Sequence, residues 1–249
     1  MSFSIRRAGA TALGLAATTA LVAACGSSSS TSSSSTGSSS TKSSAPKVAL
    51  VINGSTGDGG FFDQANAGVT KAASKLGITA KVIETGYTPT KWAPALDDAA
   101  SGDYGVVIAG SFPMAELVEQ AAAQDPSKKF VLFDVAYDKK KCGGCTNIYS
   151  IVYRYNETGY LAGVVAGLVT RSKTPRTNEA NVVGFVGGQD IPVIEQYKKG
   201  FIEGVKAVDP SATVESAFAG SFSDPVKGKQ IANNIIGKGA DVVLSLIHI

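Results

Sequence analysis

Short apolar runs alternate with longer amphipathic stretches along most of the chain, and this alternation predicts the elements and their order. Brief runs rich in β-branched residues are typical of strands buried on both faces of a parallel sheet. We expect strands at 47–52, 81–84, 106–109, 130–134, 147–153, 182–186, 214–219 and 241–244. Helical spacing predicts helices over 61–76, 90–100, 114–124, 157–171, from 192 onward, and over 226–237.

Strands that alternate with helices in this way indicate an α/β fold built from doubly wound parallel sheets. The strand, glycine-bearing loop and helix around 182–201 repeat in kind those around 47–76. Open α/β sheets bind ligands at the carboxyl ends of their strands. The pattern therefore predicts two lobes, 47–153 and 154–243, on either side of a ligand-binding cleft.

Acidic and aromatic residues gather where the expected strands end. Gly188 is a position at which the backbone can turn and approach a ligand closely. Aromatic rings in such places are more often core residues than ligand contacts, so both interpretations stay open for the phenylalanines. The candidate substrate-binding residues are Asp58, Phe61, Phe62, Asp63, Asp134, Gly188, Asp190 and Phe222.

Composition narrows the classes of function. The net charge of +3 is small, only 17% of the residues are charged, and no basic stripe with interleaved aromatics is present, which argues against nucleic acid. The glycine-rich loop 53–60 lacks the ending of a phosphate-binding P-loop. Because the sequence has no Ser/His/Asp set and no metal-ligand cluster, we expect a binding protein rather than an enzyme, without cofactor or metal.

The N-terminal segment resembles a bacterial lipoprotein signal. Arg6 and Arg7 precede a weakly apolar stretch, and 22–25 resembles a lipobox ending at Cys25. A plain secretory signal with an incidental cysteine is the alternative. Residues 26–46 are almost purely Ser and Thr and predict a flexible tether with a reach of about 25 Å. We therefore expect residues 1–25 to be a signal and the protein to be lipid-anchored on the extracytoplasmic face of the membrane.

Cys142 and Cys145 form a C-x-x-C motif that can be a redox centre, half of a zinc site or a structural disulfide. Zinc would need further ligands, and the motif leads into a strand rather than a helix. Outside the cytoplasm, a structural disulfide is the favoured interpretation. A surface thiol–disulfide protein remains as an alternative class of function.

Gly159, Gly163 and Gly167 lie four residues apart in the helix expected over 157–171. In a membrane this spacing would suggest a dimerising face. The apolar run is too short to cross a bilayer, so we expect these glycines to pack closely against a sheet.

Several longer motifs resemble a known family, the basic membrane protein lipoproteins, which are substrate-binding components of ABC importers with the type I periplasmic-binding fold. The motifs are 183–194, 200–205 and 220–229, with 160–163 in support. The resemblance implies an ABC permease as partner, a monomer, and purine nucleosides as ligands, held by base stacking and by acids that bind ribose. A receptor for a sugar or another small molecule is the alternative.

The same resemblance assigns roles to individual residues. Asp58, Phe61 and Asp63 align with the family's first-loop motif, and Asp134 matches a family acid at a strand end, as does Asp190. Phe62 stands where the family usually has asparagine, which changes the expected recognition of the base.

The resemblance also bears on the C-terminal residues. The family continues after 239–243 with further segments, whereas 244–249 resembles a sequencing adapter translated in frame. We therefore expect a truncated second lobe that ends at 243 and a non-native tail over 244–249, in which His248 has no functional role.

The lipobox interpretation makes a direct prediction. Substituting Cys25→Ser removes the only thiol that could be acylated at the expected cleavage point, so the protein should leave the membrane fraction or stay unprocessed. Cell fractionation with immunoblotting measures this. A Cys25→Ser protein that still behaves as a processed lipoprotein would contradict the assignment.

Overall fold

A computed structural model describes residues 45–172 and 174–247 of the 249-residue chain. The expected signal segment with Cys25, nearly all of the expected tether and the last two residues of the expected tail lie outside the described residues.

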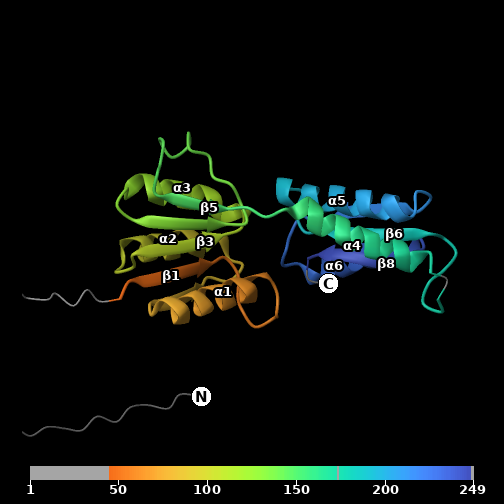
Figure 1. Cartoon of the computed structure of the whole chain (residues 1–249), viewed down its shortest axis with the longest axis horizontal. Coiled ribbons are helices and arrows are strands. Elements are labelled where there is room, and N and C mark those ends of the chain that lie inside the picture. Colours follow the sequence, from red (N-terminus) through yellow and green to blue (C-terminus); the bar gives the residue numbers. More distant parts are fainter. Residues whose placement is uncertain (1–44, 173, 248–249) are drawn as a thin grey trace, which may run out of the picture. The chain divides into compact units, whose positions relative to one another are not determined.

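The first lobe is a five-stranded parallel sheet in the order β2-β1-β3-β4-β5, with helices packed on its faces (Figure 1). The alternation of apolar runs and helical stretches predicted this arrangement. Its elements are β1 (Lys47–Ile52), α1 (Phe61–Leu76), β2 (Thr79–Glu84), η1 (Pro89–Lys91), α2 (Trp92–Ser101), β3 (Val106–Gly110), η2 (Phe112–Met114), α3 (Ala115–Gln124), β4 (Lys129–Phe133) and β5 (Ile148–Ile151).

The second lobe is a three-stranded parallel sheet in the order β7-β6-β8. The described chain passes from one sheet to the other through residues 152–154. Its elements are α4 (Tyr155–Thr170), β6 (Val182–Gly187), α5 (Pro192–Val208), β7 (Thr213–Phe218), α6 (Pro225–Gly237) and β8 (Ala240–Leu246).

β8 continues beyond the expected end of its strand. Leu244 pairs with Phe185, and Leu246 pairs with Gly187, so the ladder reaches into the residues assigned to the tail. Apolar side chains of β8, including Leu244 and Leu246, pack against the cluster around Phe185 and Phe201. The strand extends because these residues keep the apolar character that a parallel neighbour of β6 requires.

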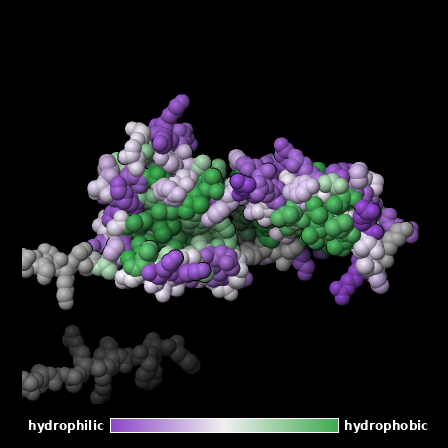
Figure 2. Space-filling model, viewed as in Figure 1, coloured by the Kyte–Doolittle hydropathy of each residue, from purple (hydrophilic) through white to green (hydrophobic). Residues whose placement is uncertain are grey.

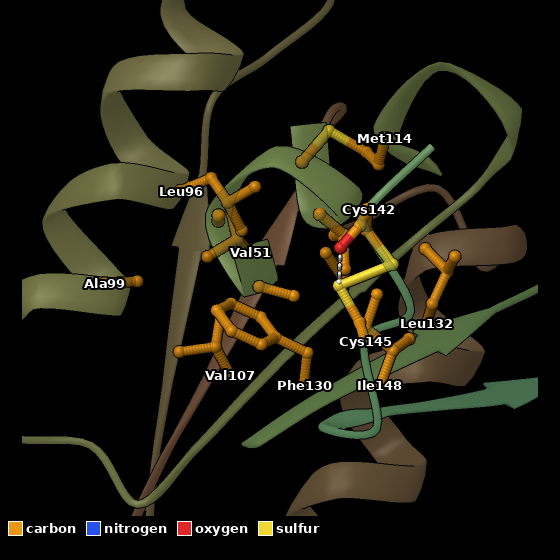
Figure 3. Close-up of a cluster of buried hydrophobic side chains, with 14 of the residues drawn as sticks. Val51, Leu96, Ala99, Val107, Met114, Phe130, Leu132, Cys142, Cys145 and Ile148 are labelled. Carbon is orange, nitrogen blue, oxygen red and sulfur yellow. Dashed lines mark hydrogen bonds between the residues drawn. A yellow bond between two sulfur atoms is a disulfide. The ribbon is translucent and has the colours of Figure 1, made fainter. Parts of the chain in front are cut away.

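The connection from β4 to β5 contains no helix, although parallel neighbours are usually joined through one. A turn joined by the Cys142–Cys145 disulfide covers the sheet there instead (Figure 3). Both cysteines are buried in the cluster that includes Phe130 and Ile148. The side-chain nitrogen of Asn147, just before β5, donates to the carbonyl oxygens of three residues at the end of α3 and beyond it, Ala122, Asp125 and Lys128, each at 3.0 Å.

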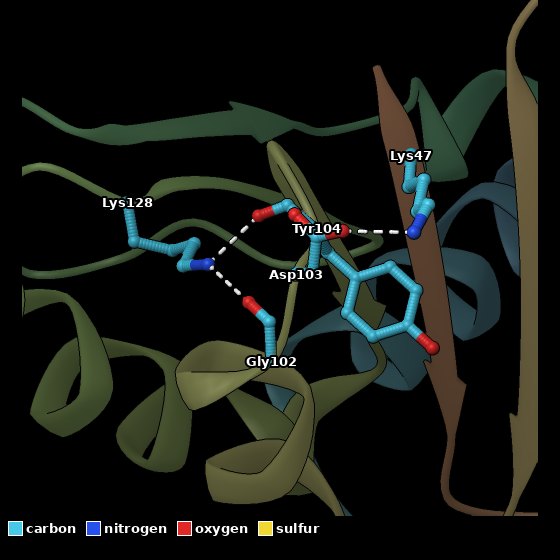
Figure 4. Close-up of polar contacts among 5 residues, drawn as sticks. All are labelled: Lys47, Gly102, Asp103, Tyr104 and Lys128. Atoms are coloured by element: carbon cyan, nitrogen blue, oxygen red, sulfur yellow. Dashed lines mark hydrogen bonds and ion pairs between the residues drawn. The ribbon is translucent and has the colours of Figure 1, made fainter. Parts of the chain in front are cut away.

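A polar network ties the chain together at the amino ends of the first sheet's strands (Figure 4). Lys128 Nζ donates to the carbonyl oxygens of Gly102 and Tyr104, at 2.9 and 2.7 Å. Lys47 forms an ion pair with Asp103 at 2.8 Å. Because this ion pair is exposed, it contributes little to stability, and the end of the sheet depends on the backbone contacts.

The glycines of α4 pack against a helix rather than against a sheet, which corrects the expectation from the sequence. α4 and α5 run alongside each other (Figure 1). A Cβ on Gly163 would lie 2.1 Å from the Phe201 carbonyl oxygen, and one on Gly204 would lie 2.1 Å from that of Tyr160. The two backbones approach this closely because both helices have glycine at the crossing.

The other side of α4 is apolar and exposed. Leu161, Val165 and Leu168 have exposed fractions of 66%, 60% and 49%. Apolar residues also gather on the surface over the second lobe in Figure 2. α4 therefore has two apolar faces, of which α5 covers one and the other is exposed.

The helix crossing predicts the outcome of a single methyl insertion. Gly163→Ala should lower the free energy of unfolding by about 1–3 kcal/mol, because the rigid Phe201 backbone cannot yield to the new Cβ. Gly68→Ala is the matched control: Gly68 lies in α1 with nothing within 4 Å of an added Cβ, so this variant should gain about 0.5–1 kcal/mol. Urea unfolding measures both, and equal stabilities of the two variants would contradict the packing account.

Candidate ligand-binding site

One cavity of about 600 Å³ is lined by residues that follow the strand ends of both sheets. Its size falls within the range of small-molecule sites, and its wall is largely apolar with a few polar groups. The lining residues are Asn53, Asp58, Phe61, Phe62, Tyr87, Pro89, Trp92, Ser111, Phe112, Pro113, Asp134, Gln189, Ile191, Val193, Ile194, Tyr197, Ser221, Phe222, Ser223, Ser245, Leu246 and Ile247.

The cavity lies at the topological switch point of each sheet. In the first sheet, β1 lies between β2 and β3, and the chain crosses from β2 on one side of it to β3 on the other. Asn53 follows β1 and Ser111 follows β3, and the Ser111 hydroxyl donates to Asn53 Oδ1 at 2.9 Å. In the second sheet, Gln189 follows β6 while Ser245 lies near the end of β8. Ligands of open α/β sheets bind where the strand order reverses, and this cavity occupies that place.

Phe61 is an exposed ring supported by two others. Its ring is 45% exposed at the start of α1, although aromatic side chains more often pack in the core. The Phe61 centroid lies 5.0 Å from that of Phe62 and 5.7 Å from that of Phe133. Both supporting rings are buried in a cluster with Leu50 and Ile52. Phe61 is therefore presented to the cavity on an apolar base, which favours ligand contact over a core role.

Sequence reasoning missed several aromatic residues of the wall. Tyr87, Trp92, Phe112 and Tyr197 all line the cavity. The indole nitrogen of Trp92 donates to the Gly86 carbonyl oxygen at 3.1 Å, which fixes the ring beside the loop that follows β2. Tyr87 and Phe112 lie just after β2 and β3, and Tyr197 lies in α5, the helix that follows β6. Their position after a strand was the signal that could have identified these three residues.

Asp134 directly follows β4 and lines the cavity in a strained conformation. Its φ of 68° is in the left-handed region, which costs energy for a residue with a side chain. Burial raises the pKa of Asp134 from 3.8 to about 6, and the neighbouring Tyr155 hydroxyl opposes that rise. The Tyr155 hydroxyl oxygen is itself buried and, within the described residues, no partner meets hydrogen-bond geometry with it.

Ser111, directly after the adjacent β3, is also in the left-handed region, with a φ of 75°. β3 and β4 are paired neighbours, so two strained residues stand side by side at the same edge of the sheet. Unfavourable backbone conformations cluster at functional sites because the surrounding structure can hold them there. The two strained residues therefore favour this edge of the sheet as the ligand-binding one.

The acid of the first loop, Asp58, and the acid in the first turn of α1, Asp63, have different positions. Asp58 lines the cavity, and its carboxylate accepts the Gly60 N–H at 2.7 Å. Asp63 does not line the cavity; its carboxylate accepts the N–H groups of Gly57 and Gly59, the latter at 2.6 Å. Those hydrogen bonds, with that of Gly57 foremost, hold the pKa of Asp63 below its usual range. Asp63 thus shapes the loop that presents Asp58.

The second lobe places one of its three candidate residues on the wall. Phe222 lines the cavity between Ser221 and Ser223. Asp190 is exposed and does not line the cavity, whereas the preceding Gln189 does. Gly188 is buried behind Phe222 and does not line the cavity either. The structure therefore brings Asp58, Phe61, Phe62, Asp134 and Phe222 together and leaves Asp63, Gly188 and Asp190 behind or beside them.

Two parallel sheets with a cavity at their strand ends are the architecture of the type I periplasmic-binding fold. Residues 45–249 match the family model described as ABC transporter substrate-binding protein PnrA-like. The chain belongs to this family, the basic membrane protein family.

Known relatives agree with this assignment. The chain is 34% identical over 148 residues to the CD4+ T-cell-stimulating antigen of Listeria monocytogenes, covering 59% of this chain and 38% of that protein. It is 34% identical over 165 residues to the ABC transporter nucleoside-binding protein BmpA of Lactococcus lactis, covering 64% of this chain and 43% of the relative. The chain thus spans less than half the length of either curated relative.

A solved structure supports the fold. The crystal structure of an ABC transporter solute-binding protein from Aeropyrum pernix superposes with a TM-score of 0.70 at 27% sequence identity. The match covers 80% of this chain and 54% of that structure.

The raised pKa of Asp134 predicts a pH dependence of stability. Between about pH 4 and 6 the folded protein keeps Asp134 protonated while the unfolded chain ionises it, so the free energy of unfolding falls as the pH rises. Asp134→Asn stays neutral throughout and should lose this fall, which makes the variant more stable than the wild type above about pH 6. Thermal melts across this range measure the difference. Parallel curves for the two proteins would contradict the assignment.

Proposed function

We propose that the protein is the substrate-binding component of an ABC importer and that its ligand is a purine nucleoside. The observation that carries the proposal is a single cavity in which exposed aromatic rings stand beside carboxylates and amides. A nucleoside needs this combination, because its base is flat and apolar on both faces while its ribose and base edges are polar.

The aromatic rings provide the surface for the base. Phe61 in the first lobe and Phe222 in the second line the same cavity. Base–aromatic stacking contributes about 1–3 kcal/mol per base and tolerates different bases. Phe61 is held by its ring contacts before any ligand arrives, so binding costs little ordering of this side chain.

The polar groups account for the sugar and for the edge of the base. Asp58 and Asp134 present carboxyl groups that can accept hydrogen bonds from ribose hydroxyls. Phe62 has no amide group, and its ring is buried over Gly54. It therefore cannot make the polar contact of the asparagine that is usual in the family. Asn53 and Gln189 line the cavity and supply amides in its place.

One relative supports the proposed ligand class. The Lactococcus lactis relative is named as a nucleoside-binding protein. The proposed partner is an ABC permease, and the protein acts as a monomer. Cys142 and Cys145 are buried among apolar side chains, which argues against the alternative of a surface thiol–disulfide protein.

The proposal places the protein on the extracytoplasmic face of the cell membrane, anchored by lipid at Cys25. Residues 26–46 would act as the tether. No helix in the described part of the chain has both the length and the apolar character to cross a bilayer.

The stacking role of Phe61 is tested by Phe61→Ala. The variant should weaken nucleoside binding by roughly ten- to a hundredfold, because one base–ring contact is lost. Tyr149→Ala is the matched control: Tyr149 is 69% exposed on β5 and does not line the cavity, so this variant should bind as the wild type does. Calorimetry on variants of known folded fraction measures both affinities.

Two results would contradict the proposal in different ways. A Phe61→Ala protein that melts early yet binds nucleoside with unchanged affinity would assign Phe61 to the core. A wild-type protein that binds sugars but no nucleoside would favour the alternative receptor of the same fold.

A further inference from the structure

Four glycines lie at or just after the ends of strands: one after β1, one at the end of β3, one at the end of β6 and one directly after β6. At each of them, a phenylalanine ring occupies the space that a side chain would otherwise take. A Cβ added to Gly54 would lie 2.2 Å from the Phe62 ring, and one added to Gly110 would lie 2.4 Å from the Phe133 ring. A Cβ on Gly187 would lie 2.5 Å from the Phe218 ring, and one on Gly188 would lie 2.2 Å from the Phe222 ring.

Gly188 is the sharpest instance, because its ring lines the cavity. Gly188 does not have a positive φ, so its φ does not by itself require glycine. It does not line the cavity either, so it has no contact with a ligand to preserve. What the position requires is the empty volume that the Phe222 ring fills.

The loop that carries Phe222 is fixed at both ends and cannot simply move with its ring. The Ser221 N–H donates to the Gly188 carbonyl oxygen at 3.0 Å, and the Ala219 N–H donates to that of Gly187 at 2.9 Å. Beyond the ring, Asp224 caps α6 by accepting the Lys227 N–H at 3.0 Å. A side chain on Gly188 would therefore displace the ring itself into or out of the cavity.

We propose that Gly188 is a positioning residue that fixes where the aromatic wall of the second lobe stands and so sets the width of the cavity. The ring approaches the backbone just after β6 this closely only while position 188 has no side chain. The consequence for affinity rests on the proposed function, since it takes Phe222 to contact the ligand. The placement of the ring does not depend on it.

The placement is tested without ligand. 4-Fluorophenylalanine is incorporated at position 222, and its ¹⁹F resonance is recorded in the otherwise wild-type protein, in Gly188→Ala and in the control Gly68→Ala. Gly188→Ala should shift the resonance and Gly68→Ala should not, because nothing lies within 4 Å of a Cβ on Gly68. An unchanged resonance in Gly188→Ala overturns the proposal.

Binding supplies a second, coupled test. Gly188→Ala should weaken nucleoside binding by about tenfold, as expected for partial loss of one base–ring contact. In a Phe222→Ala background, where the volume is vacant, the same substitution should change affinity by less than about twofold. Equal losses in both backgrounds would show that Gly188 acts on the ligand by itself and would overturn the positioning role.

The experiments distinguish a folding defect of the variant from a failure of the proposed function. If Gly188→Ala alone does not fold, the double variant with Phe222→Ala should restore folding, and a double variant that stays unfolded overturns the proposal. If the wild-type protein binds no nucleoside, the proposed function fails, while the ligand-free ¹⁹F comparison still decides the role of Gly188.

Discussion

The reversal of strand order in each sheet is the constraint on which the site depends. Because β1 and β3 are parallel neighbours whose crossovers leave in opposite directions, Asn53 and Ser111 come together at one edge with no helix between them. In the second lobe, β7 and β8 flank β6 on opposite sides, and Gln189 and Ser245 line the same cavity. The chemistry of the site is thus placed by topology before any individual side chain is considered.

Side-chain packing then determines how the site is presented. Phe61 stays exposed because Phe62 and Phe133 occupy the apolar layer beneath it. Asp134 is kept partly buried and in a left-handed conformation, two features that cost stability and that the five-stranded sheet maintains. Ligand binding is served by residues that the fold alone would not favour, which is expected where function and stability compete.

The sequence predicted the parallel sheets and nearly all elements, because apolar runs and helical spacing are strong local signals. It identified Phe61, Asp134 and Phe222 because strand ends can be located from those signals. It could not separate Asp63 from Asp58, since the two acids are five residues apart and only the folded loop shows that Asp63 accepts the N–H groups of Gly57 and Gly59 while Asp58 lines the cavity. Long-range contacts are also invisible to local patterns: the α4 glycines face α5, and Trp92 reaches the cavity from a helix start.

In the proposed function, one cavity recognises base and ribose together. Calorimetric titration of the wild-type protein with a purine nucleoside, with the free base and with ribose tests it most directly. We expect measurable binding of the nucleoside and at least about a hundredfold weaker binding of either half, because each half loses the stacking or the carboxylate contacts. Binding of ribose or another sugar with an affinity equal to or above that of every nucleoside tested would contradict it.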